Sequence, residues 1–309
     1  MQHLRGLEAV KLDGSWVTIG SFDGVHLGHQ SIIRRLVAGA HADNLPAIVI
    51  TFFPHPSKVL RGNGAPFYLT TPEERAAILS DLDVDFAITL TFDKELASHT
   101  ADEFIGDLWR HLSLKHLLVG HDFALGRGRE GNFDVLGKLS QKYGYSIEEF
   151  VPFMIEGEVV SSSRIREMIN EGNVRRASQY LGRFYDVEGK VVPGDGRGRT
   201  IGIPTANLEI WKERLLPGRG VYATLADYAG KTYPSVTNIG LRPTFENQSS
   251  LLTIETHLLG LSQDLYGSFL KLEFVEFLRS EQRFPSVQAL VDQIHSDIDR
   301  AKGVLSHVS

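Results

Sequence analysis

Two histidines stand in the first segment of the sequence that could do chemistry. Residues 20–29 read Gly-Ser-Phe-Asp-Gly-Val-His-Leu-Gly-His, and they lead from a short apolar run into a helical pattern. The start of a helix offers unpaired backbone N–H groups and the positive end of a dipole, which favour a bound phosphate. His26 and His29 are three residues apart, so both rings can point to one side of the first turn and donate hydrogen bonds to phosphate oxygens. Gly28 between them would let a ligand approach the backbone closely.

The histidine pair also allows less specific interpretations. Two histidines at this spacing occur by chance or as a surface pair. A metal pair is a further alternative, although no third ligand lies nearby in the sequence. The position at a strand-to-helix turn favours the phosphate site over both.

Further segments of the first half could complete such a site. Residues 160–166, Val-Ser-Ser-Ser-Arg-Ile-Arg, stand at the start of a helical stretch. A helix cap explains one serine, whereas three hydroxyls followed by two guanidinium groups indicate a polyphosphate clamp. The Gly- and Arg-rich loop 119–129 could also contact phosphate. Residues 51–56, Thr-Phe-Phe-Pro-His-Pro, predict either a simple turn or the wall of a pocket for a flat ring.

The densest glycine stretch of the chain lies in the second half. Residues 194–207 read Gly-Asp-Gly-Arg-Gly-Arg-Thr-Ile-Gly-Ile-Pro-Thr-Ala-Asn. Glycines of this kind are either merely flexible or let backbone amides curl around an anion. The Gly-Lys-Ser/Thr of a Walker A loop is missing. Thr205 and Asn207, which follow the rigid Pro204, can jointly bind a hydrated Mg²⁺ ion and phosphate oxygens.

A carboxylate in a strand-like segment is the second candidate of this half. Residues 252–258 read Leu-Thr-Ile-Glu-Thr-His-Leu. Because successive side chains of a strand point to opposite faces, Glu255 shares a face with Thr253 and His257. A solvated glutamate is the default interpretation of such a position, and a general base is the alternative.

The elements around these residues predict an α/β protein. In the first half, short apolar runs alternate with amphipathic segments, which is typical of a parallel sheet with helices on both faces. Ligands of such sheets bind beyond the carboxyl ends of the strands, where the unusual residues of this chain lie. The runs cover residues 17–20, 47–52, 86–92 and 116–120, and the helical segments lie near 29–43, 72–81, 101–112 and 133–143.

The second half has another pattern, with turns between most of its strand-like segments. After two helical stretches near 162–181, this spacing predicts a closed antiparallel sheet or small β-barrel. An amphipathic helix is expected over 286–305. We place the domain boundary so that the two domains cover residues 1–182 and 183–309. The strand-like segments are 185–192, 221–228, 231–240, 252–259 and 269–278.

Composition excludes several classes of function. The chain of 309 residues has a net charge of −6, with 32 basic and 38 acidic residues, so a general role on nucleic acid is disfavoured. It has no cysteine, which excludes disulfides, thiol nucleophiles and cysteine-ligated zinc. No signal-peptide pattern and no run of about 18 apolar residues is present, so we expect a cytoplasmic protein without a membrane partner. A homo-oligomer is compatible with the sequence.

The motifs resemble those of a known family when they are taken together. Residues 20–29 and 161–166 resemble the nucleotidyltransferase signatures, and the segments 51–56 and 119–123 match the bacterial bifunctional riboflavin kinase/FAD synthetase family in the same order. Pro204 to Asn207, Glu255 and Asp264 to Gly267 resemble its kinase domain, as do Asn238 to Gly240 and Arg242 to Phe245. The resemblance implies a Rossmann-like FMN adenylyltransferase domain followed by a riboflavin kinase barrel. Leu125 and Gly260 depart from it, since many relatives have an aromatic residue and an acid there.

The resemblance also implies roles for individual residues. In adenylyl transfer, the FMN phosphate would attack the α-phosphorus of ATP, with His26 and His29 on the ATP phosphates. The departing pyrophosphate would be held by Ser162, Ser163 and Arg166. In the kinase, Glu255 would take the proton of the ribityl 5′-hydroxyl as it attacks the γ-phosphate. Thr205 and Asn207 would hold Mg²⁺ with ATP. The implied ATP-binding residues are Gly20, Phe22, Asp23, Gly28, Asp122, Arg127, Ser162, Ser163 and Arg166 in the first domain, and Gly194, Gly198, Gly202, Thr205 and Asn207 in the second. The small-molecule partners are riboflavin, FMN and ATP.

Two other functions remain as alternatives. Class I aminoacyl-tRNA synthetases share the His-x-Gly-His motif and a downstream clamp, but they need tRNA-binding modules and a basic surface. A paralogue could keep one of the two activities or bind flavin as a regulator. A pure binding module is disfavoured by the presence of His26, His29, Arg166, Thr205, Asn207 and Glu255.

Overall fold

The chain divides into two compact units, which we describe separately. The structure is a computed structural model that describes residues 1–62, 66–194, 196, 198, 201–242 and 251–308. The first unit comprises Met1–Ser162 and the second Ser163–Ser309. Between this division and the boundary expected at residue 182 lie two helices, α6 (Ser162–Asn170) and α7 (Val174–Leu181). Helix α7 packs against strands of the second unit.

A six-stranded parallel sheet forms the centre of the first unit. The strand order is β1-β4-β3-β2-β5-β6, and every neighbouring pair is parallel. The four strands expected from the apolar runs occupy the middle of the sheet, which confirms the predicted parallel sheet. The edge strands β1 and β6 were not predicted. The strands are β1 (Gln2–Leu4), β2 (Ser15–Ile19), β3 (Ala47–Phe53), β4 (Phe86–Thr91), β5 (Leu114–Gly120) and β6 (Ser146–Phe150).

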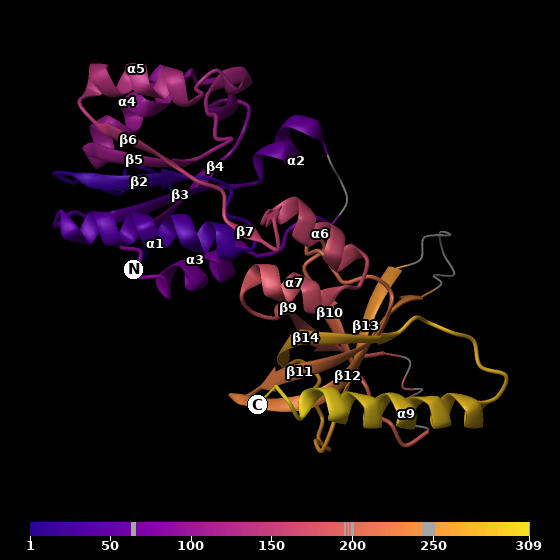
Figure 1. The fold of residues 1–309 in the computed structure, drawn as a ribbon. Helices are drawn as coiled ribbons and strands as arrows, with labels where there is room; N and C mark the ends of the chain where they lie inside the picture. Colours follow the sequence, from indigo (N-terminus) through magenta and orange to yellow (C-terminus); the bar gives the residue numbers. More distant parts are fainter. Residues whose placement is uncertain (63–65, 195, 197, 199–200, 243–250, 309) are drawn as a thin grey trace. The chain divides into compact units, whose positions relative to one another are not determined.

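Helices cover both faces of this sheet, as expected. Helices α1 (Leu27–Ala42) and α3 (Pro72–Ser80) lie on one face, and α4 (Ala101–Leu112) and α5 (Phe133–Tyr143) lie on the other (Figure 1). Alternate residues of each central strand enter the two cores, because side chains of a strand alternate between its faces. Helices α3 and α4 each begin with a complete capping box.

Short elements connect the larger ones in the first unit. Helix α2 follows β3 directly, and its six residues begin at a proline. Two 3₁₀ turns and a small hairpin complete the unit. These elements are α2 (Pro56–Arg61), η1 (Leu96–Ser98), η2 (Arg127–Arg129), β7 (Met154–Ile155) and β8 (Glu158–Val159).

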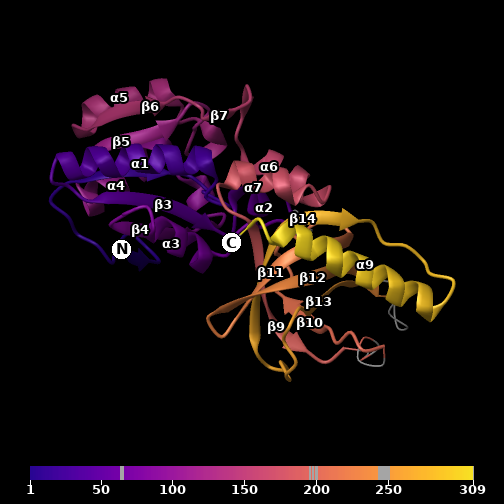
Figure 2. The ribbon, with the colours of Figure 1, turned by 60° about the horizontal axis from the view of Figure 1, so that its bottom comes forward.

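A closed six-stranded antiparallel barrel forms the second unit, and this confirms the predicted barrel. Its strand order is β10-β13-β12-β11-β14-β9, closed by the pairing of β9 with β10. Helix α9 (Val287–Leu305) lies along the barrel and packs against β11, β12 and β14 (Figure 2). The strands are β9 (Tyr185–Val192), β10 (Ala206–Ile210), β11 (Gly220–Tyr228), β12 (Lys231–Arg242), β13 (Leu251–Leu258) and β14 (Phe269–Arg279).

Hydroxyl groups fill part of the barrel interior. Thr224, Ser235, Thr237 and Thr256 are all fully buried. The Thr224 hydroxyl lies 2.8 Å from Ser235 Oγ and 2.7 Å from Thr237 Oγ1, and Thr237 donates to Thr256 at 2.9 Å. Each buried hydroxyl therefore has a partner, which removes the cost of leaving a polar group unpaired in a core.

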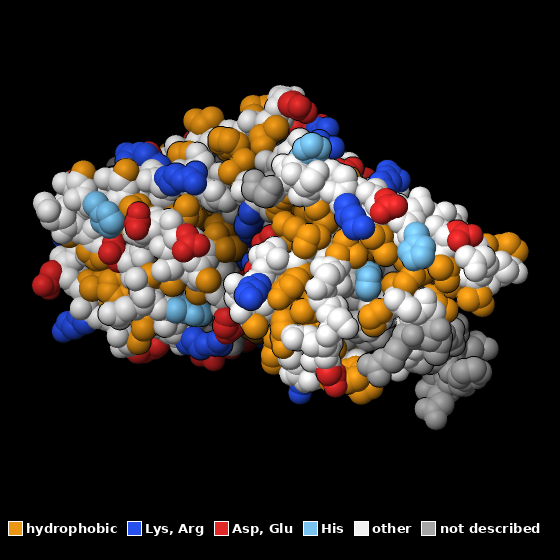
Figure 3. Space-filling model, turned by 90° about the horizontal axis from the view of Figure 1, so that it is seen from below, with side chains coloured by type: hydrophobic (Ala, Val, Ile, Leu, Met, Phe, Trp, Pro, Cys, Tyr) orange, Lys and Arg blue, Asp and Glu red, His pale blue; other side chains and the backbone are white. Residues whose placement is uncertain are grey.

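Charged side chains of both signs are spread over one face of the molecule (Figure 3). On the face drawn in Figure 3, lysine and arginine side chains stand among aspartate and glutamate side chains and do not gather into one basic patch. Within the described parts of the chain, no helix is both long and apolar enough to cross a membrane.

Candidate active sites

The two histidines of the first unit lie together at the start of helix α1. Their rings stack with centroids 3.5 Å apart and an interplanar angle of 16°. His26 is the N-cap residue, and its Nδ1 accepts a hydrogen bond from the backbone N–H of His29 at 3.2 Å. An accepting Nδ1 carries no proton, so in the neutral ring Nε2 is the donor. The expected arrangement of both rings on one side of the first turn is present.

Gly20, Phe22 and Gly28 shape the space around the two histidine rings. A Cβ atom on Gly28 would lie 3.2 Å from the His26 ring and 3.3 Å from the Val160 carbonyl oxygen, so Gly28 makes room for His26. A Cβ atom on Gly20 would lie 3.1 Å from the buried ring of Phe22, which meets the His29 ring edge-on at 5.1 Å. That Gly28 also lets a ligand approach the backbone closely stays a prediction.

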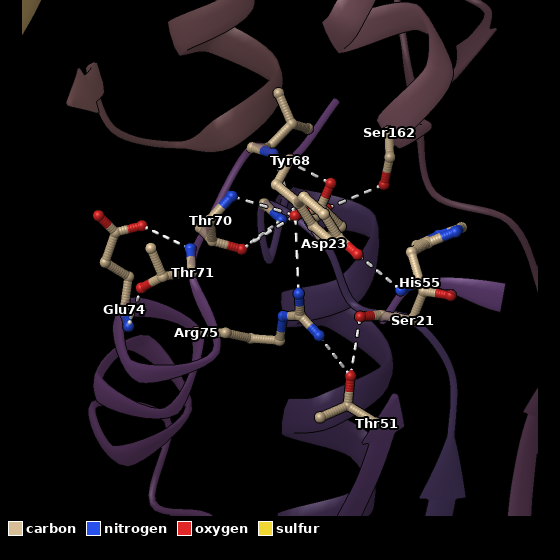
Figure 4. A network of polar contacts seen from close by, with 12 residues as sticks. Ser21, Asp23, Thr51, His55, Tyr68, Thr70, Thr71, Glu74, Arg75 and Ser162 are labelled. Carbon is tan, nitrogen blue, oxygen red and sulfur yellow. Dashed lines mark hydrogen bonds and ion pairs between the residues drawn. The ribbon is translucent and has the colours of Figure 1, made fainter. Parts of the chain in front are cut away.

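Asp23, which is expected among the ATP-binding residues, has its carboxylate turned into the protein interior. Its side chain is fully buried and accepts hydrogen bonds from the backbone N–H groups of Leu69 and Thr70 and from the Thr70 hydroxyl, at 3.0–3.1 Å (Figure 4). The guanidinium of Arg75, which is 1% exposed, lies 3.7 Å away. Asp23 therefore holds the loop in place from the inside.

The other expected phosphate ligands of this region lie in different settings. Ser162 begins helix α6, and its hydroxyl donates to the Asp23 carbonyl oxygen at 2.9 Å. Ser163 and Arg166 follow on α6 in the second unit; Ser163 is exposed and Arg166 half-buried. Asp122 and Arg127 are exposed in the loop after β5. The Asp122 carbonyl accepts a hydrogen bond from Arg129, and the Arg127 backbone N–H donates to His99.

A largely apolar cavity of about 350 Å³ opens beside the start of this loop. Gly20 and Ser21, at the carboxyl end of β2, form part of its wall, as do residues of the predicted ring-binding segment 51–56. His99 and Arg61 add polar groups that the sequence did not single out, and Arg129 comes from the Gly- and Arg-rich loop 119–129. Leu125, where relatives often have an aromatic residue, also lines it. Apolar lining residues include Ile19, Phe52, Pro56, Phe92, Phe104 and Phe123.

Strand pairing builds the site of the second unit. Asn207 on β10 lies directly opposite Glu255 on β13, and Glu255 lies directly opposite Asn238 on β12. Directly opposite residues share a face of the sheet, so the three side chains form a row across three strands. Their flanking residues Ala206, Ile254 and Thr237 are buried. The row therefore lies on the outer surface of the barrel wall, where its members are half-buried. Asn238 was quoted in the sequence only as part of a motif, because its place beside Glu255 depends on strand register.

The glycine stretch packs closely on Asn207 and Thr205. A Cβ atom on Gly194 would lie 2.1 Å from the Asn207 amide nitrogen. One on Gly198 would lie 2.3 Å from the Ile203 carbonyl oxygen and 3.3 Å from the Thr205 hydroxyl. Gly202 has a φ of +78°, a conformation that favours glycine. Arg197, Arg199 and Thr200 lie outside the described residues, as do Pro243 to Phe245 of another motif.

A cavity of about 320 Å³ lies next to Thr205 at one end of the barrel. The buried residues Ala206, Thr256 and Leu258 form one wall, and residues 261–266 form the other. The Asp264 to Gly267 motif therefore contributes to the same cavity as Thr205. Asn207 and Glu255 point to the outer surface and are not in its lining. Gly260, where relatives often have an acid, has a φ of +80° in the turn after β13.

Another carboxylate of the barrel, Glu273, is set apart from this row. Burial raises the pKa of Glu273 on β14, while Lys271 acts in the opposite direction. In the strand register, Glu273 lies opposite Asp186 on β9 and Leu225 on β11. These strands belong to the other half of the barrel wall. Glu255 is therefore the carboxylate that strand pairing places beside Asn207.

The side chains available as metal ligands indicate which kind of metal ion the protein can bind. In the part of the chain that the structure describes, no group of three or more His, Asp or Glu side chains is arranged to hold a metal ion. The amide and hydroxyl oxygens of Asn207 and Thr205, packed against glycines, fit a hard cation that takes its remaining ligands from phosphate and water, as Mg²⁺ does.

Comparison with known proteins identifies both halves of the chain. The FAD synthetase family model matches residues 9–164, and the riboflavin kinase family model matches residues 181–305. The bifunctional riboflavin kinase/FMN adenylyltransferase of Haemophilus influenzae is 38% identical over 98% of each chain. Those of Escherichia coli and Bacillus subtilis are 38% and 36% identical, over 96% and 93% of this chain and 96% and 91% of their own.

A solved structure has the same fold along nearly the whole chain. It is titled as a macrolide-efflux protein from Streptococcus pneumoniae, is 29% identical and superposes with a TM-score of 0.88 over 97% of this chain and 98% of its own. The efflux description belongs to that protein's title, whereas both family models and the curated relatives agree on flavin enzymes. This chain belongs to the bifunctional riboflavin kinase/FMN adenylyltransferase family.

Proposed function

We propose that the second unit phosphorylates riboflavin to FMN and that the first unit transfers the adenylyl group of ATP to FMN, which gives FAD and pyrophosphate. The assignment of one reaction to each unit rests on the difference between the two sites. The first combines stacked imidazoles at a helix start with an apolar cavity, and the second places a glutamate beside two asparagines. The substrates are riboflavin, FMN and ATP.

In the first unit, the proposed chemistry is positioning and charge stabilisation. An oxygen of the FMN phosphate forms the new bond to the α-phosphorus, and the bond from that phosphorus to the bridging oxygen breaks, with its electrons leaving on pyrophosphate. The attacking phosphate is already an anion, so no general base is needed. His26, whose helix cap leaves Nε2 as the donor, and His29 would stabilise charge on the ATP phosphates.

The remaining residues proposed for adenylyl transfer are assigned from the cavity and from the family resemblance. The apolar cavity beside Gly20 suits the flat ring system of FMN, with segment 51–56 as one wall. Ser162, Ser163 and Arg166 at the start of α6 would hold pyrophosphate, and Asp122 and Arg127 remain candidates for nucleotide contacts. We assign Asp23 and Phe22 to support of the loop, because both side chains are buried.

In the second unit, Glu255 would act as a general base. It accepts the proton of the ribityl 5′-hydroxyl while that oxygen bonds to the γ-phosphorus, and the bond to the β–γ bridging oxygen breaks to leave ADP. Asn207 and Thr205 would hold the phosphates and Mg²⁺, with Gly194, Gly198 and Gly202 shaping the loop around them. Bound Mg²⁺ would neutralise charge on the triphosphate.

Product analysis of the purified protein tests this proposal. The protein is incubated with riboflavin, ATP and Mg²⁺, and the flavins are separated by chromatography. Conversion of riboflavin first to FMN and then to FAD is expected. FMN without FAD would show a kinase alone, and unchanged riboflavin would indicate a flavin-binding regulator.

A further inference from the structure

A buried arginine contacts two parts of the site in the first unit. One edge of the site is the loop that contains Asp23 and leads to the histidine pair, and the other edge is the end of β3. Arg75 lies on α3, and its guanidinium is 1% exposed. On one side it faces the Asp23 carboxylate at 3.7 Å. On the other side its Nη1 donates to the Thr51 hydroxyl at 2.7 Å (Figure 4). The same nitrogen donates to the Phe52 carbonyl oxygen at 3.4 Å. A planar guanidinium can bind two partners at once in fixed directions, which an ammonium group cannot do equally well.

The loop on the Asp23 side needs support from outside. Phe22 and Val25 have φ values of 45° and 36°. Residues with a Cβ atom rarely adopt positive φ values, and β-branched residues such as valine do so least of all. Such conformations persist only where the surroundings hold them. Asp23 lies between these two residues, and the Gly24 N–H donates to the Thr70 hydroxyl at 3.0 Å. The loop therefore depends on contacts from the segment that leads into α3.

The other edge, at the end of β3, is held by contacts from α3 and from the segment that leads into it. The Thr51 hydroxyl, which accepts from Arg75, donates to the Ser21 carbonyl oxygen at 2.8 Å. The His55 N–H donates to the buried hydroxyl of Tyr68 at 2.7 Å. Ser21, Phe52 and His55 line the apolar cavity. The contacts of Arg75 thus run from the loop that ends in the histidine pair to the wall of the cavity.

We propose that Arg75 is a positioning residue for adenylyl transfer, which fixes the histidine loop relative to the cavity wall without contacting either substrate. This inference rests on the proposed function, in which ATP phosphates bind at the histidines and the flavin binds in the cavity. In-line attack requires both substrates to be held together, and a misplacement of about 1 Å costs about 10²-fold in rate. Each substrate would still bind its own edge after the connection is lost.

The first test replaces Arg75 by methionine, which keeps length and removes the charge. FAD formation from supplied FMN should lose about 10²-fold in kcat, while the dissociation constants of FMN, measured by flavin fluorescence, and of ATP change by less than about threefold. Arg75→Lys should recover part of the loss. FMN formation from riboflavin by the same chain should stay within about twofold, since it belongs to the other unit.

These readouts separate positioning from stability alone. Circular dichroism establishes that each variant is folded at the assay temperature. If Arg75 only stabilises the fold, the folded Arg75→Met protein keeps the kcat of the original chain, and the proposal is wrong. A parallel loss of binding of both substrates in folded protein would also contradict it.

A second pair of variants decides the matter if Arg75→Met does not fold. Thr51→Val is nearly isosteric but breaks the hydrogen bonds to Arg75 and Ser21, whereas Thr51→Ser keeps the hydroxyl. Valine should lower kcat for FAD formation about tenfold and serine by less than about twofold. Equal activity of the valine variant and the original chain, or equal loss in both variants, would overturn the proposal.

His29→Ala distinguishes this inference from the proposed function. If that substitution abolishes FAD formation while Arg75→Met leaves it unchanged, only the positioning role is wrong. If neither substitution affects FAD formation, the assignment of the first site itself is wrong, and the positioning role falls with it.

Discussion

The two units bring polar groups together by different means. In the barrel, Asn207, Glu255 and Asn238 are neighbours because antiparallel register sets them opposite one another. In the first unit, the histidine pair depends on a loop with positive φ values, whose carboxylate Asp23 is held by residues 46 or more positions away. A site built on strands takes its geometry from the sheet ladder, whereas a site built on a loop takes it from tertiary contacts. Substitutions near the two sites should therefore differ in how they act.

The largest effect should come from Glu255→Gln, which removes the base and keeps the shape of the side chain. The rate of FMN formation should fall by about 10²–10⁴-fold, the usual contribution of a general base. FAD formation from supplied FMN should stay within about twofold. Chromatography of both reactions checks this, and an equal loss of the two activities in folded protein would break the comparison between independent sites.

A somewhat smaller effect is expected for His29→Ala in the first unit. Loss of one donor to a developing charge costs about 10²–10³-fold, so FAD formation should fall by this amount. The substitution also removes the ring that stacks on His26. FMN formation from riboflavin serves as the internal control and should be unchanged. If the His29→Ala protein still forms FAD rapidly, the ATP phosphates do not bind at the start of α1.

Gly194→Ala sharpens the comparison by adding only one methyl group to the barrel site. The new Cβ atom would overlap the Asn207 amide, so FMN formation should fall by at least about tenfold, with a higher KM for ATP. Gly303→Ala on α9 is the matched control, because no atom beyond its own turn of helix lies within 4 Å of its added Cβ. If both variants keep full kinase activity, Asn207 is not held where the site requires it.

The smallest predicted effect concerns pH and the stability of the first unit. Burial lowers the pKa of His116 below its ordinary 6.5, with Glu148 opposing this shift and Arg35 adding to it. The His116 ring stacks on Trp16 at 3.7 Å. The unfolded chain then binds this proton more readily than the folded one, so stability is lost as pH falls below about 6.5. His116→Phe keeps the stacked ring, so its thermal midpoint should fall less between pH 7.5 and pH 5.5 than that of the original chain. An unchanged pH dependence would contradict this assignment.

Much of the fold could be predicted from the sequence because most elements carry a strong apolar pattern. The central strands and the larger helices of the first unit agree with the expected ranges within a few residues. Strands β1 and β6 were missed because the first has three residues and the second contains the polar sequence Ser-Ile-Glu-Glu-Phe. Strand β10 was missed because Ala206 and Asn207 were interpreted only as part of a ligand loop.

The site could be predicted in its residue types but less well in its geometry. The spacing of His26 and His29 along one helix turn was sufficient to predict that their rings lie together. The direction of the Asp23 carboxylate was not predictable, because it depends on Leu69, Thr70 and Arg75, which lie far along the chain. The pairing of Asn238 with Glu255 likewise depends on a register that residue spacing along one strand does not fix. Local pattern therefore predicts chemistry, and tertiary contacts decide which polar groups face a ligand.

Mixing two single-site variants tests the central claim, two independent sites in one chain, most directly. Glu255→Gln alone should leave riboflavin unchanged, and His29→Ala alone should stop at FMN. An equimolar mixture with riboflavin, ATP and Mg²⁺ should convert riboflavin to FAD, because FMN made by one protein is free to reach the intact first unit of the other. If the mixture produces no FAD although both variants are folded, the two reactions do not belong to separate, self-sufficient sites.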